Sequence, residues 1–169
     1  RLPVVCSREE VQELLSLAQD VEGLILRLMY GTGMRVSEAL RLRVQDVHFD
    51  RNEITVRAGK GDPSSQGYAV TGKDRRVPYP KTLKEPMRAN LDWRRTLFKE
   101  DREKNMHEVE LPAALARKYK RAPYEWKWQY VFPAEDYSTD PRSGAVRRHH
   151  ILSRQIQRAV RKAAREAEI

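Results

Sequence analysis

Apolar positions near the start of the chain recur at helical spacing. Ser7 and Glu10 form a capping-box pattern, and apolar residues three or four positions apart follow it. This pattern predicts a helix over residues 8–19. Residues 24–29 keep the same period in a more apolar stretch, which predicts a second helix.

The second helix is expected to end at a pair of glycines. Gly31 and Gly33 allow a backbone turn that other residues resist. Ser37 can cap a short third helix directly after that turn. Arg35 is therefore expected at a tight junction between two helices.

The middle of the chain combines two strands with a long helix. Residues 53–57 and 75–79 have the composition of short strands, and together they predict a hairpin with an enlarged tip. A helical pattern then covers residues 81–101, with Pro86 in its first turn. A shorter helix is predicted over residues 111–118.

The last part of the chain is first aromatic and then cationic. Residues 126–132 are rich in aromatic side chains and predict a further strand, and residues 150–166 predict the last helix. That helix has an apolar side and a cationic side, and the arginines at the offsets of the cationic side are Arg147, Arg154, Arg158, Arg161 and Arg165. The whole pattern predicts one α+β domain over residues 1–169, mainly helical, with helices around a small antiparallel β-sheet.

Charge adds a candidate partner to this picture. The chain has 33 Lys and Arg against 24 Asp and Glu, a net charge of +9, and residues 141–169 carry +6 of it. A basic patch is typical of proteins that bind the phosphates of nucleic acids. A solvated basic face has the same composition, so both interpretations stand on charge alone.

Composition also excludes several classes of protein. No apolar run approaches the roughly 18 residues that a membrane helix needs, and the first residues do not form a secretory signal. Cys6 is the only cysteine, which excludes an intrachain disulfide framework and a zinc site built from several cysteines. We expect a cytoplasmic protein without a membrane partner.

The most informative motif lies between residues 30 and 46. An arginine presented from a turn between helices can donate two hydrogen bonds to a phosphate and stabilise the charge of its transition state. The motif resembles the first arginine box of tyrosine recombinases, T-G-x-R-x-x-E-x-x-x-L followed by L-x-x-x-D. The residues that match are Thr32, Gly33, Arg35, Glu38, Leu42 and Asp46. The resemblance implies a catalytic Arg35 oriented by Glu38; the alternative is an exposed ion pair at i, i+3 spacing.

A second motif of the same family lies on the predicted hairpin. Tyrosine recombinases have a pattern like G-K-G-x-K-D-R there, whose lysine donates a proton to the departing 5′ oxygen. Here Gly59-Lys-Gly61 and Lys73-Asp-Arg75 form its two halves, and residues 62–72 separate them. The resemblance implies that Lys60 is the catalytic lysine and that Lys73 and Arg75 contact DNA. A lysine in a glycine-rich hairpin is otherwise a solvated turn residue.

Residues 105–145 and the arginines and histidines after them resemble the added segment of integron integrases. Those enzymes recombine gene cassettes through folded single-stranded sites, and the segment grips bases that protrude from the hairpin. The resemblance assigns this role to Trp128, Pro141, His149 and His150. A tryptophan can stack on an unpaired base without reading its identity. Alternatively, one of the two tryptophans at 126 and 128 lies in the core, because they alternate as in a strand.

Neither a metal nor a nucleotide cofactor is expected. His149 and His150 would point about 100° apart on a helix, and no carboxylate follows at ligand spacing. The final helix carries no residue suited to nucleophilic attack. Its arginines, including Arg154 and Arg158, fit contacts with phosphate that do not depend on sequence.

The resemblance covers about the first two-thirds of a recombinase catalytic domain. Tyrosine recombinases need a second box like H-x-x-R and a nucleophilic tyrosine, but no tyrosine follows Tyr137 and Arg154 falls one position out of the H-x-x-R pattern. We therefore expect a domain truncated before its C-terminal helices, which binds DNA without cleaving it. The parent enzyme would be bacterial, nucleoid-associated and tetrameric on DNA.

Two interpretations from other classes remain open. The first is a non-catalytic DNA-binding module that kept this fold. The second is a protein-interaction domain whose basic face binds an acidic partner. Stronger binding to a hairpin DNA with protruding bases than to plain duplex would argue against the second interpretation, and equal binding to both would remove the integron assignment.

Overall fold

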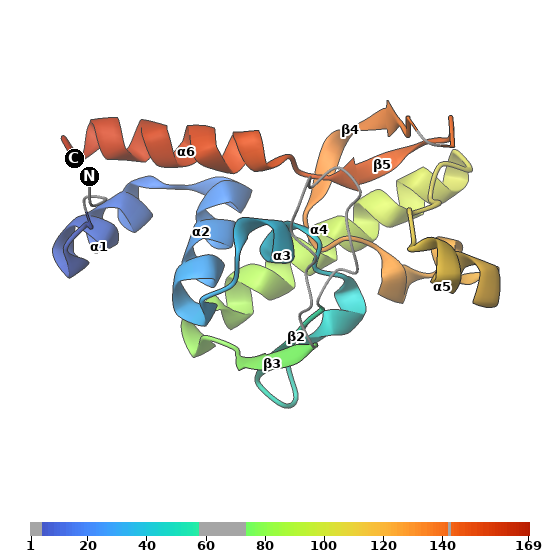
Figure 1. The fold of residues 1–169 in the computed structure, drawn as a ribbon, viewed down its shortest axis with the longest axis horizontal. Helices are drawn as coiled ribbons and strands as arrows, with labels where there is room; N and C mark the ends of the chain where they lie inside the picture. Colours follow the sequence, from blue (N-terminus) through green and yellow to red (C-terminus); the bar gives the residue numbers. More distant parts are fainter. Residues whose placement is uncertain (1–4, 58–73, 142) are drawn as a thin grey trace.

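The computed structural model describes residues 5–57, 74–141 and 143–169, and Figure 1 shows their arrangement. The α-helices, 3₁₀ helices and β-strands alternate along the chain without any repeat. They are α1 Arg8–Leu17, α2 Asp20–Thr32, α3 Val36–Leu40, η1 Val44–Asp46, β1 Val47–His48, β2 Glu53–Val56, β3 Arg75–Pro78, η2 Lys81–Leu83, α4 Lys84–Glu103, α5 Ala113–Lys118, η3 Ala122–Tyr124, η4 Trp126–Trp128, β4 Pro133–Thr139, β5 Val146–His150 and α6 Ser153–Glu166. This is the expected α+β fold.

Local signals in the sequence begin and end the first helices. The Ser7 hydroxyl accepts a hydrogen bond from the Glu10 amide at 3.2 Å, and the Glu10 carboxylate accepts one from the Ser7 amide at 2.6 Å. This pair satisfies amides that the first turn of α1 leaves unbonded. Helix α2 ends where Gly33 takes a φ of 68°, a conformation that favours glycine. The predicted turn before Arg35 is therefore confirmed.

Two small antiparallel sheets accompany the helices. Strands β1, β2 and β3 pair in that order, and Ile54 lies opposite Val77 in the predicted hairpin. Strands β4 and β5 form a separate hairpin with an irregular register. The prediction of a hairpin from residues 53–57 and 75–79 is confirmed, whereas β4 was not predicted.

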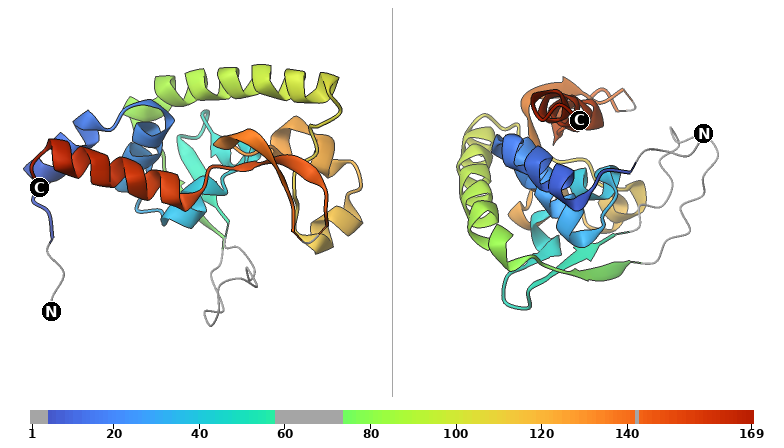
Figure 2. Two further views of the ribbon diagram at one scale, coloured as in Figure 1. Left: turned by 90° about the horizontal axis from the view of Figure 1, so that it is seen from above. Right: turned by 90° about the vertical axis from the view of Figure 1, so that its left-hand side faces the viewer.

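The main core lies between α2, the three-stranded sheet and the apolar side of α6. Fully buried residues at its centre include Ile25, Leu28, Leu40 and Ile54. In Figure 2, α4 runs along one side of the molecule, while α6 and the β4–β5 hairpin follow each other along another side. A second, smaller cluster, Val109, Leu111, Ala122 and Tyr130, packs the segment after α4.

Two predictions about the second half are wrong. Residues 126–128 form the 3₁₀ helix η4 instead of a strand, and in the following segment only Tyr130 forms an isolated bridge, with Arg43. The last helix begins at Ser153, not at residue 150, because His149 and His150 belong to strand β5. The first difference has a tertiary reason. The Val131 amide donates to the Leu42 carbonyl at 2.9 Å, which ties the segment after η4 to the residues that follow α3.

Candidate nucleic-acid site

The junction between α2 and α3 presents Arg35 to solvent. The Thr32 hydroxyl donates to the Leu28 carbonyl at 2.6 Å and accepts from the Met34 amide at 3.4 Å, which fixes the turn. Arg35 precedes α3 with an extended backbone, and its side chain is 76% exposed. The arrangement leaves most of the Arg35 side chain open to solvent, where it can meet a phosphate.

Glu38 holds two arginines from different elements. Its carboxylate oxygens accept hydrogen bonds from Nη1 and Nη2 of Arg75, each at 2.8 Å, so this pair is bidentate. One oxygen also accepts from the Arg35 amide at 2.8 Å, and the other lies 3.4 Å from Arg35 Nη1. We call Arg35, Glu38 and Arg75 the Arg35 cluster.

The Arg35 cluster keeps its carboxylate ionised. The hydrogen bonds from Arg75 lower the pKa of Glu38 to about 2, although burial opposes this shift. One carboxylate charge thus compensates two guanidinium charges, so the cluster has a net positive charge. An anion such as a phosphate is attracted to this point of the surface.

Asp46, the last residue of the matching motif, acts below this surface. It is buried, accepts from the Arg43 amide at 3.0 Å and forms an ion pair with Arg57 Nε at 2.6 Å. Burial raises the pKa of Asp46, and the arginines act in the opposite direction. Asp46 therefore holds η1 and the end of β2 together, which positions the strand pair that carries Arg75.

Two predicted residues of the hairpin, Lys60 and Lys73, lie outside the described residues. Arg75 is described, and it donates hydrogen bonds to Glu38. A contact with DNA would be additional to this pair. The catalytic roles of Arg35, Glu38 and Lys60 stay predictions, as do the DNA contacts of Lys73 and Arg75.

The two predicted histidines surround a tyrosine. The rings of His149 and His150 have centroids 4.6 Å apart, and Tyr130 lies 5.5 Å from the first and 5.1 Å from the second. The Arg43 guanidinium stacks over the same Tyr130 ring, 3.7 Å from its centroid. We call Tyr130, His149 and His150 the His149 site.

The two histidines have different hydrogen-bond partners. His149 Nε2 lies 3.0 Å from a carboxylate oxygen of Glu110. His150 Nδ1 donates to the Ile151 carbonyl at 2.7 Å, and burial lowers the pKa of His150 to about 4. His150 is therefore neutral at pH 7, with its Nε2 available as a hydrogen-bond acceptor.

Trp128 and Pro141 occupy different places around this site. Trp128 is half-buried against the small cluster that contains Tyr130, and its carbonyl accepts from Arg43 Nη1 at 2.9 Å. Pro141 is exposed in the turn between β4 and β5. The structure thus brings Trp128 near the His149 site through Tyr130, and it places Pro141 on the hairpin that carries both histidines.

Three residues of these sites were not singled out from the sequence. Tyr130 lies in the aromatic run that was assigned to a strand, and Arg43 lies inside the matching motif. Glu110 carries no signal of its own, because only the fold brings it to His149. The aromatic run was thus a usable signal with the wrong structural interpretation.

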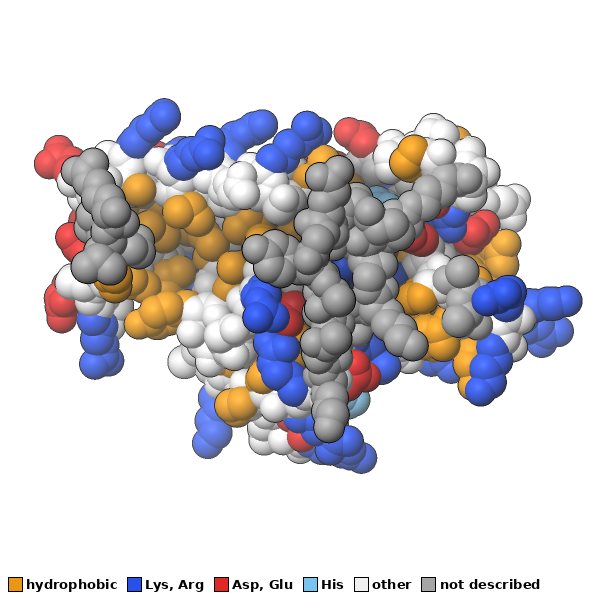
Figure 3. All heavy atoms as spheres, in the orientation of Figure 1, with side chains coloured by type: hydrophobic (Ala, Val, Ile, Leu, Met, Phe, Trp, Pro, Cys, Tyr) orange, Lys and Arg blue, Asp and Glu red, His pale blue; other side chains and the backbone are white. Residues whose placement is uncertain are grey.

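The cationic side of α6 is exposed as predicted, with one exception. Figure 3 shows Lys and Arg side chains along the edge that α6 forms, and Arg154 and Arg158 are among the exposed residues. Arg147 does not belong to this row, which is a correction. It lies in β5, is buried, and pairs with Glu108 at 3.0 Å and Asp140 at 2.9 Å.

The described residues contain neither a group of metal ligands nor a membrane-spanning helix. Nowhere in residues 5–57, 74–141 and 143–169 do three or more metal-ligating side chains gather. His149 and His150 lie in strand β5, so the prediction that they point about 100° apart on a helix is wrong. Within the same ranges, no helix has the length and apolarity needed to cross a membrane.

Comparisons with known proteins agree with this geometry. The chain is 43% identical over 169 residues to proteins named integrase/recombinase from Escherichia coli and Pseudomonas aeruginosa. The match covers the whole chain but 47% of each relative, so the chain spans about half their length. It is 37% identical over 115 residues to the tyrosine recombinase XerA from Pyrococcus furiosus, covering 64% of this chain and 37% of XerA.

A solved structure and a family model extend the comparison. The crystal structure of XerA recombinase matches with a TM-score of 0.60 at 23% identity, over 99% of this chain and 44% of the other. This likeness shows the fold. The model of the phage integrase family matches residues 5–169. The chain therefore belongs to the phage integrase family.

Proposed function

We propose that this chain is the DNA-binding part of the catalytic domain of a site-specific recombinase. The observation that carries the proposal is the Arg35 cluster, in which Glu38 forms a bidentate pair with Arg75 while the Arg35 side chain stays 76% exposed. The family membership of the chain supports the same reaction class. Arg35 would bind the scissile phosphate, and Glu38 would hold Arg35 at its backbone amide.

The complete reaction would break and rejoin DNA through a 3′-phosphotyrosine. Lys60 would protonate the departing 5′ oxygen, and Lys73, Arg75, Arg154 and Arg158 would contact backbone phosphates. The second arginine box and the nucleophilic tyrosine find no match in these 169 residues. This chain alone would therefore bind DNA without cleaving it, and the parent enzyme would act as a tetramer on DNA.

We further propose the integron type of substrate, a folded single strand with protruding bases. The His149 site supports this type, because its three rings lie together, His150 is a neutral acceptor, and Trp128 packs against the small cluster that contains Tyr130. Unpaired bases are recognised by stacking and by hydrogen bonds to their edges. Trp128, Pro141, His149 and His150 would hold such a base.

The substrate type is tested by comparing a hairpin DNA that has protruding bases with plain duplex. Trp128→Ala should weaken hairpin binding by about 5- to 100-fold, the range for losing one stacked base, and leave duplex binding unchanged. Trp93→Ala is the matched control, since Trp93 is 49% exposed on α4 and has no proposed DNA contact. Equal losses on both DNAs, with both variants folded, would remove the integron assignment.

The absence of cleavage is tested with a suicide substrate that traps covalent protein–DNA adducts. We expect binding in a gel-shift assay and no adduct on a denaturing gel. An adduct formed by this chain alone would contradict the proposal. A longer protein that supplies the second arginine box and the nucleophilic tyrosine should form the adduct. If that protein also binds DNA without forming an adduct, the result favours the non-catalytic DNA-binding module.

A further inference from the structure

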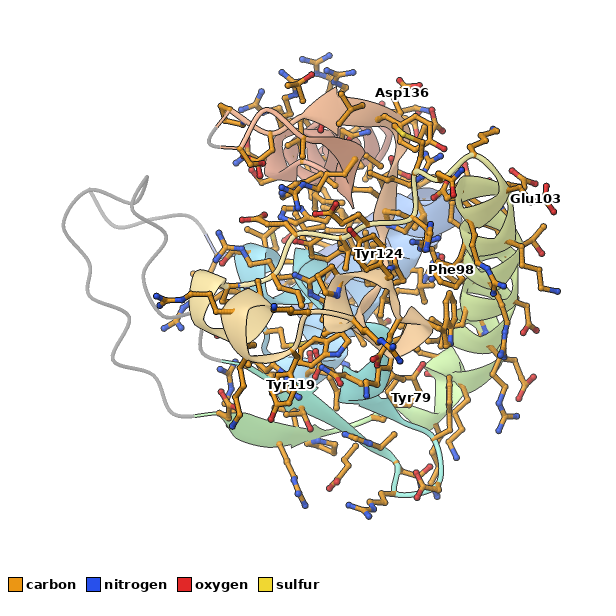
Figure 4. The ribbon with its side chains drawn as sticks, turned by 90° about the vertical axis from the view of Figure 1, so that its right-hand side faces the viewer. Tyr79, Phe98, Glu103, Tyr119, Tyr124 and Asp136 are labelled. Carbon is orange, nitrogen blue, oxygen red and sulfur yellow. The ribbon has the colours of Figure 1, made fainter. Side chains whose placement is uncertain are left out.

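A pocket of about 540 Å³ lies between the C-terminal half of α4 and the segment of η3 and η4. Its volume falls in the range of small-molecule sites, roughly 300–1,000 Å³. In Figure 4, Phe98 is labelled next to α4 and Tyr124 lies beside it, nearer the middle of the view. The pocket is lined by Arg95, Phe98, Lys99, Arg102, His107, Tyr124, Glu125 and Trp126.

One wall of the pocket is a chain of aromatic rings. The centroids of Phe98 and Trp126 are 5.5 Å apart, those of Phe98 and His107 are 5.9 Å apart, and those of His107 and Tyr124 are 5.4 Å apart. Tyr124 is 48% exposed. Rings that already hold one another at these distances form a preorganised surface on which a flat ligand can stack.

His107 adds an unused polar atom to that wall. Its Nδ1 is covered from solvent and has no hydrogen-bond partner among the described residues. The His107 carbonyl accepts from Gln129 Nε2 at 3.0 Å, which fixes the backbone beside the ring. A ligand with hydrogen-bonding edges can satisfy such an atom, whereas a purely apolar one cannot.

The opposite wall carries three cations on one side of α4. Arg95, Lys99 and Arg102 follow helical spacing and are exposed. In the part of the chain that the structure describes, none of the three pairs with a carboxylate, whereas Glu125 on the rim pairs with Lys127 at 2.9 Å. The Arg95 guanidinium lies 5.5 Å from the Trp126 centroid. Positive charge and stacking surface therefore meet in one pocket.

We propose that this pocket binds one unpaired nucleotide of a single-stranded nucleic acid. The base would stack on Tyr124 and Trp126, and its phosphates would meet Arg95, Lys99 and Arg102. A duplex keeps its base faces inside the stack and uses only the cations, and an acidic peptide has no use for the ring wall. The pocket shares no residue with the Arg35 cluster or the His149 site, so this proposal goes beyond the proposed function and can fail separately from it.

The affinity test uses a fluorescein-labelled oligothymidylate and a duplex of the same length. Trp126→Ala should weaken binding of the single strand by about 5- to 100-fold and leave the duplex unchanged, and Trp126→Phe should restore most of the loss. Tyr124→Ala, at an exposed position, repeats the test if Trp126→Ala does not fold. Equal losses on single strand and duplex, or no loss in any variant, would overturn the proposal.

The charge test compares two double substitutions that alter net charge equally. Arg95→Glu with Lys99→Glu should reduce single-strand binding more than Arg8→Glu with Lys81→Glu, because only the first pair lines the pocket. Equal reductions would mean that net charge alone binds the strand. Displacement of the oligothymidylate by poly-glutamate at equal charge would instead identify an acidic protein segment as the ligand.

Photocross-linking locates the contact directly. An oligonucleotide with bromodeoxyuridine should cross-link to a peptide containing Tyr124 or Trp126, as identified by mass spectrometry. Trp128→Ala, which tests the His149 site, should leave this cross-link in place. Cross-links confined to other peptides would overturn the proposal while leaving the proposed recombinase function intact.

Discussion

Glu38 and Asp101 each hold an arginine through two hydrogen bonds, but the two carboxylates lie in different surroundings. Glu38 pairs with Arg75 at 2.8 Å on both oxygens, near the surface. Asp101 pairs with Arg148 at 2.9 and 2.8 Å and is fully buried. The same planar geometry therefore occurs once at the edge of the protein and once inside it.

Asp101 also contacts two further polar side chains inside the fold. The Tyr137 hydroxyl donates to Asp101 at 2.6 Å, and the buried Arg94 lies 4.0 Å away. Burial raises the pKa of Asp101, but the hydrogen bonds from Arg148 and Tyr137 more than offset it, so the pKa lies below its usual value. Because Asp101 belongs to α4 and Arg148 to β5, this cluster attaches the β4–β5 hairpin to the long helix.

The two clusters differ in whether an arginine remains exposed to a ligand. In the Asp101 cluster both arginines are buried, with 2% and 7% of their side chains exposed, so no donor faces solvent. In the Arg35 cluster a second guanidinium is left over at the surface. Exposure of the second arginine, and not the presence of a bidentate pair, distinguishes the proposed phosphate site from the buried ion pair.

The strongest test of this comparison removes the buried carboxylate. Asp101→Asn leaves Arg94 and Arg148 without a compensating charge, so the free energy of unfolding should fall by about 3–5 kcal/mol. Urea denaturation measures it. Asp92→Asn is the control, because Asp92 is exposed on the same helix. Equal stability of the two variants would mean that the buried cluster does not hold the hairpin.

A smaller effect is expected at the surface carboxylate. Glu38→Gln should cost about 1–2 kcal/mol at pH 7, less than a buried pair because Arg75 is 40% exposed and partly screened by solvent. The folded pKa of Glu38, about 2, lies below its usual 4.5. Its contribution is therefore fully present above pH 4.5 and is lost as the pH falls toward 2.

The pH dependence of unfolding checks this sign. The stability difference between the wild type and Glu38→Gln should shrink as the pH falls from 4.5 toward 2. Glu85→Gln is the matched control, because its pair with Arg88 also measures 2.8 Å but Glu85 is 79% exposed. A difference that stays constant through this pH range would contradict the lowered pKa of Glu38.

The smallest effect on stability is expected at Arg35, the residue proposed to bind the scissile phosphate. Arg35→Ala should change the free energy of unfolding by less than about 0.5 kcal/mol, as for an exposed side chain. The slope of log affinity for duplex DNA against log salt concentration should fall by about 0.9, one phosphate contact. Arg8→Ala, also exposed, should leave the slope unchanged. If Arg35→Ala lowers the stability and leaves the salt slope unchanged, Arg35 has a structural role like that of Arg148.

Local signals predicted the elements that depend on neighbours in the sequence. The capping box at Ser7, the glycine turn before Arg35 and the hairpin of β2 and β3 all appear where expected. Each depends on hydrogen bonds or backbone conformations within a few residues. Motif spacing likewise predicted that Arg35 and Glu38 lie together, since Arg35 directly precedes the short helix α3 and Glu38 follows three residues later in its first turn.

Contacts between distant residues were not predictable in this way. The segment 126–132 has the composition of a strand, yet its first three residues form a 3₁₀ helix. The rest of the segment is held by hydrogen bonds from the Val131 amide to the Leu42 carbonyl and from the Val44 amide to the Gln129 carbonyl. Arg147 has the spacing of a helix face but is buried in a strand by Glu108 and Asp140. In each case one deciding partner lies dozens of residues away, residues 42–44 in the first and Glu108 in the second.

The family motif, the order of most elements and the location of excess positive charge follow from residue type and short spacing along the chain. Which of these charges remain exposed depends on the folded arrangement. It brought Arg75 across to Glu38, buried Arg147 and Arg148, and gathered Arg95, Lys99 and Trp126 around one pocket. The physical reason is that an ion pair or a ring contact depends on distance in space, which residue spacing along the chain does not encode.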